Sequence, residues 1–165
     1  MLPITFLSVG GTIDKVYFDA ASEFEVGESV VSHILREALV SFEFLQIELM
    51  RKDSLEMMES DRQLVADTIR DHSSKRFIVT HGTDTMTDTA AALSDLADKT
   101  VVFTGALTPA RFRTTDAVFN IGMAVAAVQC ASAGVYVAMN GQIFPAAEVR
   151  KNKEKRAFER ITKPV

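Results

Sequence analysis

The sequence predicts an α/β fold: a single domain of three layers, in which helices on both faces cover a doubly wound, mainly parallel sheet. Two observations support this prediction. Short apolar runs alternate with segments of helical spacing along the chain, and 165 residues is a usual size for one domain. Strands that alternate with helices imply right-handed crossovers, which make neighbouring strands parallel.

Five short runs of apolar or β-branched residues end in glycine, polar or turn residues, as expected of buried strands. They are residues 3–9, 42–50, 76–80, 100–104 and 134–139. The run Val101-Val102-Phe103 shows no polar alternation, which is typical of a strand that is covered on both faces.

Four segments between or after these runs have helical spacing. They are residues 28–39, 61–71, 85–97 and 116–132. Ser60 and Gln63 predict a capping box at the start of the second helix. The single cysteine, Cys130, lies in an apolar stretch of the fourth, so we expect a buried, inert thiol and no disulfide within the chain. Residues 150–165 are charged, and we expect them to form an exposed tail or a docking segment.

Composition and charge narrow the classes of partner. The formal net charge is −4, which gives no general attraction to phosphate backbones or anionic membranes, so we expect neither nucleic acid nor membrane binding. The apolar run at residues 1–9 has no basic region and is too short for a signal peptide or a membrane span. We therefore expect a cytoplasmic protein.

Ligands of parallel sheets bind beyond the carboxyl ends of the strands, and four expected strands run into polar or glycine-containing segments. These segments are Gly10-Gly11-Thr12, Lys52-Asp53-Ser54, His81-Gly82-Thr83-Asp84-Thr85 and Gly105-Ala106. The first pair of glycines allows a sharp turn that leaves Thr12 exposed near backbone amides, as a hydroxyl nucleophile requires. An ordinary strand-to-loop turn would use the same glycines.

The segment from His81 to Thr85 offers several roles. Thr83 can supply a hydroxyl and a backbone amide, and Asp84 can hold an ammonium group or orient a lysine. Thr83 or Thr85 could equally cap the helix that follows. We interpret His81 as a structural hydrogen-bonding residue, because the sequence offers it no second metal ligand. Nucleotide-binding, serine-hydrolase and paired metal-ligand motifs are absent from the sequence, so we expect no cofactor and no metal.

Two motifs, in this order and spacing, resemble the signatures of the bacterial-type L-asparaginase family. They are Val9-Gly10-Gly11-Thr12-Ile13 and Thr80-His81-Gly82-Thr83-Asp84-Thr85-Met86. The similarity continues to Val149-Arg150-Lys151 and covers almost the whole chain, but only the amino-terminal domain of the family's usual two. The resemblance implies a short-chain form, in which residues 1–149 are an amino-terminal-type domain and the charged tail, residues 150–165, carries a catalytic lysine.

The resemblance also implies the catalytic residues. Thr12 would be the nucleophile that attacks the amide carbon, and Thr83, Asp84 and Lys151 would form a second trio in which the lysine activates a hydroxyl. Such a lysine needs burial or a nearby cation that disfavours its charge.

The resemblance further implies how the substrate is held. Ser54 would grip the α-carboxylate, Asp84 the α-ammonium group, and backbone amides near Gly11 and Thr83 the oxyanion. The full set of expected substrate-binding residues is Gly11, Ser54, Glu56, Gly82, Thr83 and Asp84.

Three departures from the family pattern bear on this site. Phe24 aligns with a loop tyrosine that polarises the nucleophile, so we expect Tyr17 to supply the missing hydroxyl and to be catalytic. Leu55 stands where many relatives have a glutamine that contacts the substrate amine, and Glu56 could compensate in part. Relatives complete the site with an acidic residue from a neighbour's second domain, which we do not expect here. Either another residue from a partner chain replaces it, or the enzyme works without it.

We therefore expect an L-asparaginase that hydrolyses asparagine to aspartate and ammonia through a threonine nucleophile and an acyl-enzyme. Glutaminase activity should be weaker or absent, because one more methylene in a pocket costs about 1–3 kcal/mol. Two alternatives remain open: a non-catalytic amino-acid-binding relative, and an amidase or amidotransferase component that acts on a larger amide. The expected partners are L-asparagine and further copies of the chain, as a homodimer or homotetramer that uses residues 107–113.

Overall fold

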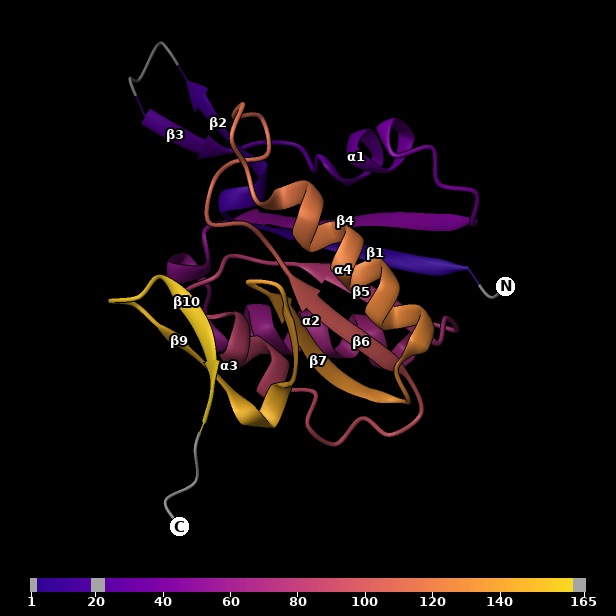
Figure 1. The fold of residues 1–165 in the computed structure, drawn as a ribbon. Helices are drawn as coiled ribbons and strands as arrows, with labels where there is room; N and C mark the ends of the chain where they lie inside the picture. Colours follow the sequence, from indigo (N-terminus) through magenta and orange to yellow (C-terminus); the bar gives the residue numbers. More distant parts are fainter. Residues whose placement is uncertain (1–2, 19–22, 162–165) are drawn as a thin grey trace.

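The structure is a computed structural model that describes residues 3–18 and 23–161. Its main sheet has six strands in the order β4-β1-β5-β6-β7-β8 (Figure 1). These are β1 (Ile4–Gly10), β4 (Phe44–Lys52), β5 (Arg76–Thr80), β6 (Thr100–Thr104), β7 (Gly134–Met139) and β8 (Gln142–Pro145). Only β8, which pairs with β7, is antiparallel, so the predicted mainly parallel sheet is confirmed.

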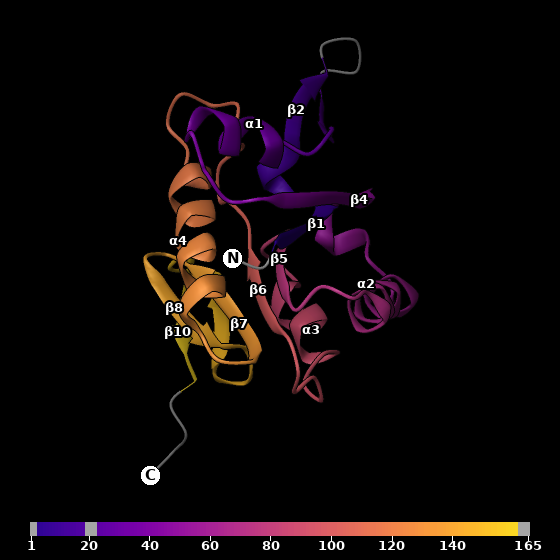
Figure 2. The same ribbon diagram turned by 90° about the vertical axis from the view of Figure 1, so that its right-hand side faces the viewer.

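Helices cover both faces of this sheet, which gives three layers (Figure 2). One face carries α1 (Val31–Glu37) and α4 (Ala117–Cys130), and the other carries α2 (Glu59–Asp71) and α3 (Met86–Ala91). None of the helices within residues 3–18 and 23–161 is long and apolar enough to cross a bilayer.

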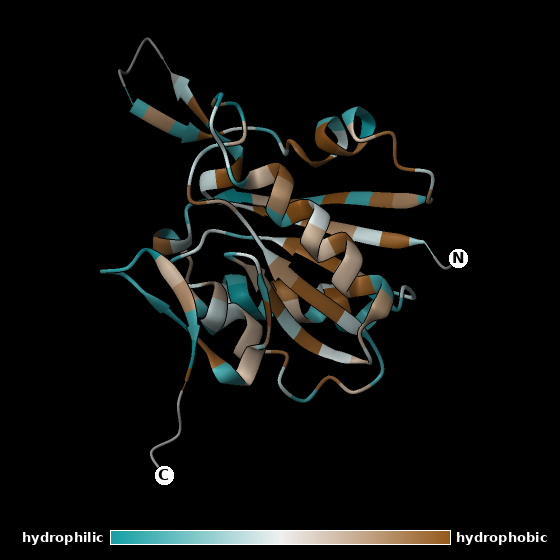
Figure 3. Cartoon of the chain, in the orientation of Figure 1, coloured by the Kyte–Doolittle hydropathy of each residue, from teal (hydrophilic) through white to brown (hydrophobic). Residues whose placement is uncertain are grey.

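Alternate residues of each central strand enter two separate cores. Ile78 and Val102 pack with α1 and α4, whereas Phe77, Val101 and their alternate neighbours pack with α2 and α3. Since both faces are buried, the strands lack the polar alternation of a half-exposed sheet. Figure 3 shows this as hydrophobic strands in the centre of the molecule.

The start of α2 differs from the capping box expected at Ser60 and Gln63. Met58 is the N-cap residue, and its backbone N–H donates to the Asp61 carboxylate at 2.8 Å. The predicted N-cap, Ser60, is therefore wrong by two residues. The Asp61 side chain, in the first turn, accepts from the free N-cap amide in place of Gln63.

Two other expectations fail at helix ends. α3 is shorter than predicted, because residues 92–95 form turns, in which the amides of Ala92, Leu93 and Ser94 donate to carbonyls three residues back. Cys130 ends α4 and is exposed, so the prediction of a buried thiol is wrong. α4 carries apolar residues on all sides, but only one side packs on the sheet. Val118 and Phe119 are exposed on the other side.

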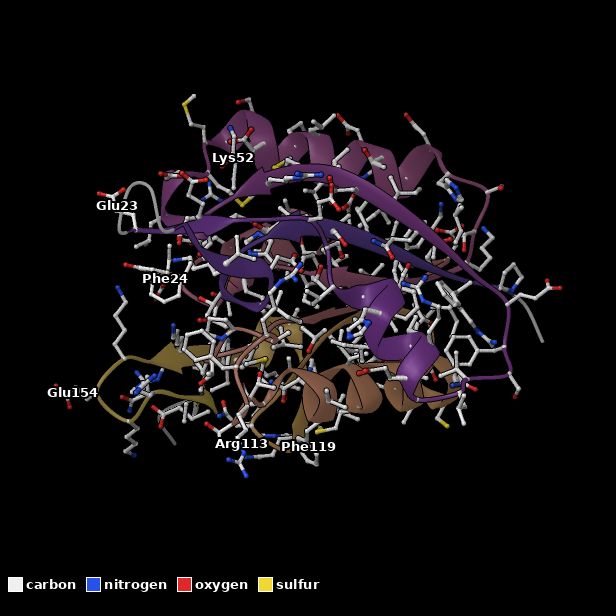
Figure 4. The ribbon with its side chains drawn as sticks, turned by 90° about the horizontal axis from the view of Figure 1, so that it is seen from above. Glu23, Phe24, Lys52, Arg113, Phe119 and Glu154 are labelled. Atoms are coloured by element: carbon white, nitrogen blue, oxygen red, sulfur yellow. The ribbon has the colours of Figure 1, made fainter. Side chains whose placement is uncertain are left out.

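Two antiparallel hairpins were not predicted from the sequence. One consists of β2 (Lys15–Phe18) and β3 (Glu23–Val26), and the other of β9 (Val149–Asn152) and β10 (Ala157–Arg160). Both lie on the side of the molecule where β1 ends (Figure 1), and Figure 4 shows Phe24 and Glu154 on that side. The segment expected as a tail is thus a hairpin as far as Arg160, held by the buried ring of Phe158.

Candidate active site

Three strands meet at their carboxyl ends through residues with almost no side chain. A Cβ atom on Gly11 would lie 2.4 Å from the backbone of Gly82, and one on Gly82 would lie 2.5 Å from the Ser54 hydroxyl. Gly11 also has a φ of 92°, which favours glycine. The residues that follow β1, β5 and β4 are therefore packed as closely as backbone allows, and Thr12 and Thr83 enter one region.

Neither Thr83 nor Thr85 caps α3 with its side chain. Thr85 is the N-cap residue but makes no capping bond, and its hydroxyl instead donates to the carbonyl of Ser54 at 2.8 Å. This bond ties the loop after β5 to the loop after β4. The Thr83 hydroxyl has a different partner, Lys151.

A cavity of about 230 Å³ opens at this edge of the sheet. Its lining residues are Thr12, Thr83, Asp84, Leu107, Lys151, Lys153 and Arg156. Pockets for drug-sized ligands usually measure roughly 300–1,000 Å³, so this cavity suits a ligand of amino-acid size. Four of the expected catalytic residues, Thr12, Thr83, Asp84 and Lys151, thus border one cavity, although they come from three separate segments of the chain.

Lys151 joins the second motif through two short bonds. Its ammonium group donates to Thr83 Oγ1 at 2.7 Å and to Asp84 Oδ1 at 2.8 Å, and its side chain is only 14% exposed. The lysine comes from β9, where its neighbour across the hairpin is the buried Phe158. An amine at this distance from a hydroxyl can exchange a proton with it, as activation of a hydroxyl requires.

His81 is a structural residue, as interpreted from the sequence. It is fully buried, with Nδ1 2.8 Å from the Gly82 carbonyl and Nε2 2.8 Å from the Thr89 hydroxyl. Since a carbonyl only accepts, Nδ1 donates and Nε2 accepts from Thr89. Burial lowers the pKa of His81 to about 4, so the ring is neutral at pH 7 and does not line the cavity.

Tyr17, the expected catalytic tyrosine, does not line this cavity. It lies on β2 directly opposite Phe24 on β3, with the ring centres 5.4 Å apart. The Phe24 ring in turn contacts Phe112 in the loop before α4, at 5.9 Å. The two positions considered for the loop tyrosine are therefore cross-strand neighbours, and both side chains are about half exposed.

The two residues expected to contact the substrate after β4 differ in their surroundings. Ser54 is buried, and its hydroxyl has no hydrogen-bond partner among the described residues. Glu56 and Leu55 belong to the short helix η2 (Ser54–Glu56), are exposed and do not line the cavity. The serine hydroxyl is thus held against Gly82, while the Glu56 carboxylate faces solvent.

Asp14 holds the base of the β2–β3 hairpin and was not singled out in the sequence. Its backbone carbonyl accepts from Gly27, and its carboxylate accepts from the Val30 amide at 2.9 Å. Burial raises the pKa of Asp14 to about 6. The sequence could not single out Asp14, because its partners are backbone amides, which leave no pattern of side chains in the sequence.

Lys153 and Arg156 were also missed. Both line the cavity, but in the sequence they belong to a run of alternating charges that reads as a solvated segment. Only the hairpin geometry brings them to the site.

Comparison with known proteins agrees with this geometry. The family described as "Asparaginase, N-terminal" matches residues 3–164. The chain belongs to this family.

Curated relatives of this asparaginase-family chain are longer than it is. It is 33% identical over 160 residues to L-asparaginase 2 of Escherichia coli K12, which covers 90% of the chain and 46% of the relative. It is 37% identical over 101 residues to the glutaminase-asparaginase of Acinetobacter glutaminasificans, which covers 58% and 30%. The chain therefore spans less than half the length of these two relatives.

A solved structure shows the same fold. The thermostable L-asparaginase from Thermococcus kodakarensis superposes with a TM-score of 0.82 at 24% identity, over 99% of this chain and 52% of that one. The asparaginase-family chain thus has the fold of about half of this neighbour.

Proposed function

We propose that this chain forms the active site of an amidohydrolase that converts asparagine to aspartate and ammonia. The observation that carries the proposal is the shared cavity of Thr12, Thr83, Asp84 and Lys151. A hydroxyl nucleophile needs a proton acceptor and a group that orients this acceptor, and these residues supply each part. Membership of the asparaginase family supports the same reaction class.

The proposed reaction has two stages. The Thr12 oxygen attacks the amide carbon, the hydroxyl proton passes through Thr83 to the neutral amine form of Lys151, and backbone amides near Gly11 and Thr83 stabilise the oxyanion. The C–N bond then breaks, the leaving nitrogen takes a proton, and ammonia departs. Water attacks the resulting ester in the same way and releases aspartate with the Thr12 hydroxyl restored.

The remaining site residues would hold the substrate. We propose that Asp84 attracts the α-ammonium group and that Ser54, whose buried hydroxyl has no partner among the described residues, grips the α-carboxylate. Gly11 and Gly82 would let the backbone approach the substrate closely. Tyr17 would supply the phenol that polarises Thr12, which requires its side chain to turn from Phe24 toward the cavity. Glu56, which is exposed, would act only at the rim.

The proposed selectivity is for the shorter amide. A site fitted to asparagine must accommodate one more methylene when glutamine binds, so glutamine should react more slowly, by a factor of roughly 10–200. A relative that carries both activities in its name, the glutaminase-asparaginase, makes this comparison informative.

Ammonia release from asparagine and glutamine tests the proposal. We expect turnover of asparagine, and its loss in Thr12→Ala with unchanged thermal unfolding. Glutamine turned over faster than asparagine would contradict the proposed selectivity. Asparagine binding without any turnover by the unmutated chain would support the non-catalytic alternative, and turnover of only larger amides would support the amidase alternative.

We further propose that copies of the chain associate in the cytoplasm as a homodimer or homotetramer. The loop at residues 107–113 supports this assembly, since Phe112 is 44% exposed there. Light scattering on the purified protein, with Phe112→Ser as the comparison, tests it; an unmutated monomer at all concentrations would contradict it.

A further inference from the structure

Lys15 connects three parts of the proposed site. Its backbone amide donates to the carbonyl of Thr12, and it is the first residue of β2, the strand that carries Tyr17. Its ammonium group reaches the loop after β4, where it lies 2.6 Å from Asp53 Oδ2. The lysine is thus bonded both to the residue of the proposed nucleophile and to the segment that carries Ser54.

Asp53 joins the lysine to the short helix η2. Its Oδ1 accepts from the Leu55 amide at 3.1 Å, which caps η2, and its Oδ2 accepts from Lys15. Burial raises the pKa of this carboxyl, but the bonds from Lys15 and from the Leu55 amide lower it more, so the pKa lies below its ordinary value. The carboxylate is therefore ionised at neutral pH, and the side chains of the pair are each only 26% exposed.

The β2–β3 hairpin carries Lys15 and Tyr17 on one face. Alternate residues of a strand point to the same side, and so do residues directly opposite each other in an antiparallel pair. Lys15 pairs with Val26, and Tyr17 pairs with Phe24. The Val26 side chain would lie 3.0 Å from a Cβ atom on Gly10. This face of the hairpin is therefore turned toward the carboxyl end of β1.

The Lys15–Val26 pair is anchored, and the Tyr17–Phe24 pair extends from it. Residues two positions apart in a strand are separated by roughly 7 Å, so the position of Lys15 limits where the phenol can lie. Within the described residues of the hairpin, 15–18 and 23–26, no side chain other than that of Lys15 forms an ion pair. The bond to Asp53 therefore supplies the charged anchor of a hairpin whose two aromatic rings are about half exposed.

We propose that the Lys15–Asp53 pair positions the Tyr17 phenol relative to the proposed nucleophile. This inference rests on the proposed amidohydrolase function and on the role proposed there for Tyr17. Lys15 and Asp53 are positioning residues, because neither lines the cavity. Loss of the pair leaves every catalytic group in the protein but disconnects the hairpin from the loop that carries Ser54.

Steady-state kinetics with asparagine test this connection. Lys15→Met removes the ion pair, and Asp53→Asn also removes it but keeps an oxygen that can cap η2. Each should lower kcat by roughly tenfold, and the double variant should lower it no further, because both changes remove the same charge-assisted bond. KM should change less than kcat, since neither side chain contacts the substrate. Lys15→Arg keeps the charge and should keep most of the activity.

A double-mutant cycle shows whether the pair acts through the tyrosine. In Tyr17→Phe no phenol remains to be positioned, so the addition of Lys15→Met should lower kcat no further. A second fall as large as that in the Tyr17-containing protein would overturn the proposal, because the lysine would then act on another group. Unchanged kcat in Lys15→Met would overturn it as well.

Lys52→Met is the matched control. Lys52 immediately precedes Asp53 and also forms a short ion pair, at 2.8 Å, but its partner is Asp61 of α2. It lies on the same side of the molecule as Phe24 (Figure 4). The substitution should leave kcat unchanged, and thermal unfolding of each variant checks that the fold persists. An equal fall of kcat in Lys52→Met would mean that any lost charge near the site has this effect, which would refute a specific role of Lys15.

Tyrosine fluorescence tests the connection without any turnover. The chain has no tryptophan and two tyrosines, Tyr17 and Tyr136, so Tyr136→Phe leaves Tyr17 as the single tyrosine emitter. In this background Lys15→Met should lower the fluorescence anisotropy and Lys52→Met should not. Unchanged anisotropy in Lys15→Met would overturn the proposal. If the unmutated protein released no ammonia, the proposed function would fail, while the anisotropy would still decide whether the pair holds the tyrosine.

Discussion

The Lys151 ammonium group lies 2.7 Å from the hydroxyl of Thr83, although 68 positions separate the two residues in the chain. The pair forms because the chain leaves the main sheet after β8, and β9 of the following hairpin brings Lys151 to the residues that follow β5. Asp84 accepts a second bond from the same ammonium group and fixes its position. The contact therefore depends on the β9–β10 hairpin as much as on the parallel sheet.

Replacement of Lys151 should affect catalysis far more than folding. Lys151→Met removes the group that exchanges a proton with Thr83, and we expect kcat for asparagine to fall by roughly 10²–10⁴-fold. Lys155→Met, in the same hairpin but paired with Glu159, should retain activity. More than a tenth of the original kcat in Lys151→Met would show that the lysine is dispensable.

The cross-strand pair Tyr17 and Phe24 allows the phenol to be moved between two positions. Tyr17→Phe should lower kcat on the order of 10²-fold, because no hydroxyl remains to polarise Thr12. The double variant Tyr17→Phe with Phe24→Tyr keeps the same two rings and should recover activity, since the side chains face each other at 5.4 Å. Unchanged kcat in Tyr17→Phe would remove the tyrosine from the mechanism.

Gly82 should tolerate no side chain. A methyl group there would meet the Ser54 hydroxyl at 2.5 Å, so we expect Gly82→Ala to lower the free energy of unfolding by about 1–3 kcal/mol. Gly122→Ala in α4 is the control, because no heavy atom lies within 4 Å of its added Cβ, and it should stabilise by up to about 1 kcal/mol. Chemical denaturation measures both changes, and equal stability of the two variants would contradict the close packing of the segments that follow β4 and β5.

Two buried groups should give opposite pH dependences of stability. The pKa of His81 falls from 6.5 to about 4 on folding. Its contribution to the free energy of unfolding is therefore present above pH 6.5 and is lost as the pH falls through 4. The pKa of Asp14 rises from 3.8 to about 6, so its contribution is present below pH 3.8 and is lost as the pH rises through 6. Each difference corresponds to about 3 kcal/mol, and the two nearly cancel between pH 4 and 6.

Single substitutions should reveal each of these slopes. Of these two contributions, Asp14→Asn keeps only that of His81, so the free energy of unfolding should rise from pH 4 to 6.5. In His81→Gln only the Asp14 contribution remains, and the free energy should fall over the same range. Urea denaturation at several pH values measures both, and parallel profiles for the two variants would refute the assigned pKa values.

The sequence predicted the sheet and its helices because buried strands and amphipathic helices have clear periodicities. The Arg76–Thr80 strand, for example, was predicted with the bounds that it has in the structure. The hairpins escaped prediction because Glu23–Val26 is mostly exposed and β9 lies in a run of charges, where apolar periodicity is weak.

The candidate site divides in the same way. Thr12, Thr83 and Asp84 follow strands and belong to recognisable motifs, so their meeting at one edge could be predicted from topology. Lys153 and Arg156 could not, because their place in the cavity depends on a four-residue turn whose arginine adopts a positive φ. Cys130 shows the converse error, since the apolar sequence around it does not reveal which side of α4 faces the sheet.

Lys151 follows β8, the last strand of the main sheet, and this order affects when the site can form during synthesis. A nascent chain that has emerged only to the end of β8 contains Thr12, Thr83 and Asp84 but still lacks their amine. Folding from the amino terminus on the ribosome would therefore complete the main sheet before the proposed site receives its lysine. The β9–β10 hairpin would add this amine to a scaffold that is already folded, so nicking near residue 149 would leave the sheet in place without the proposed catalytic lysine.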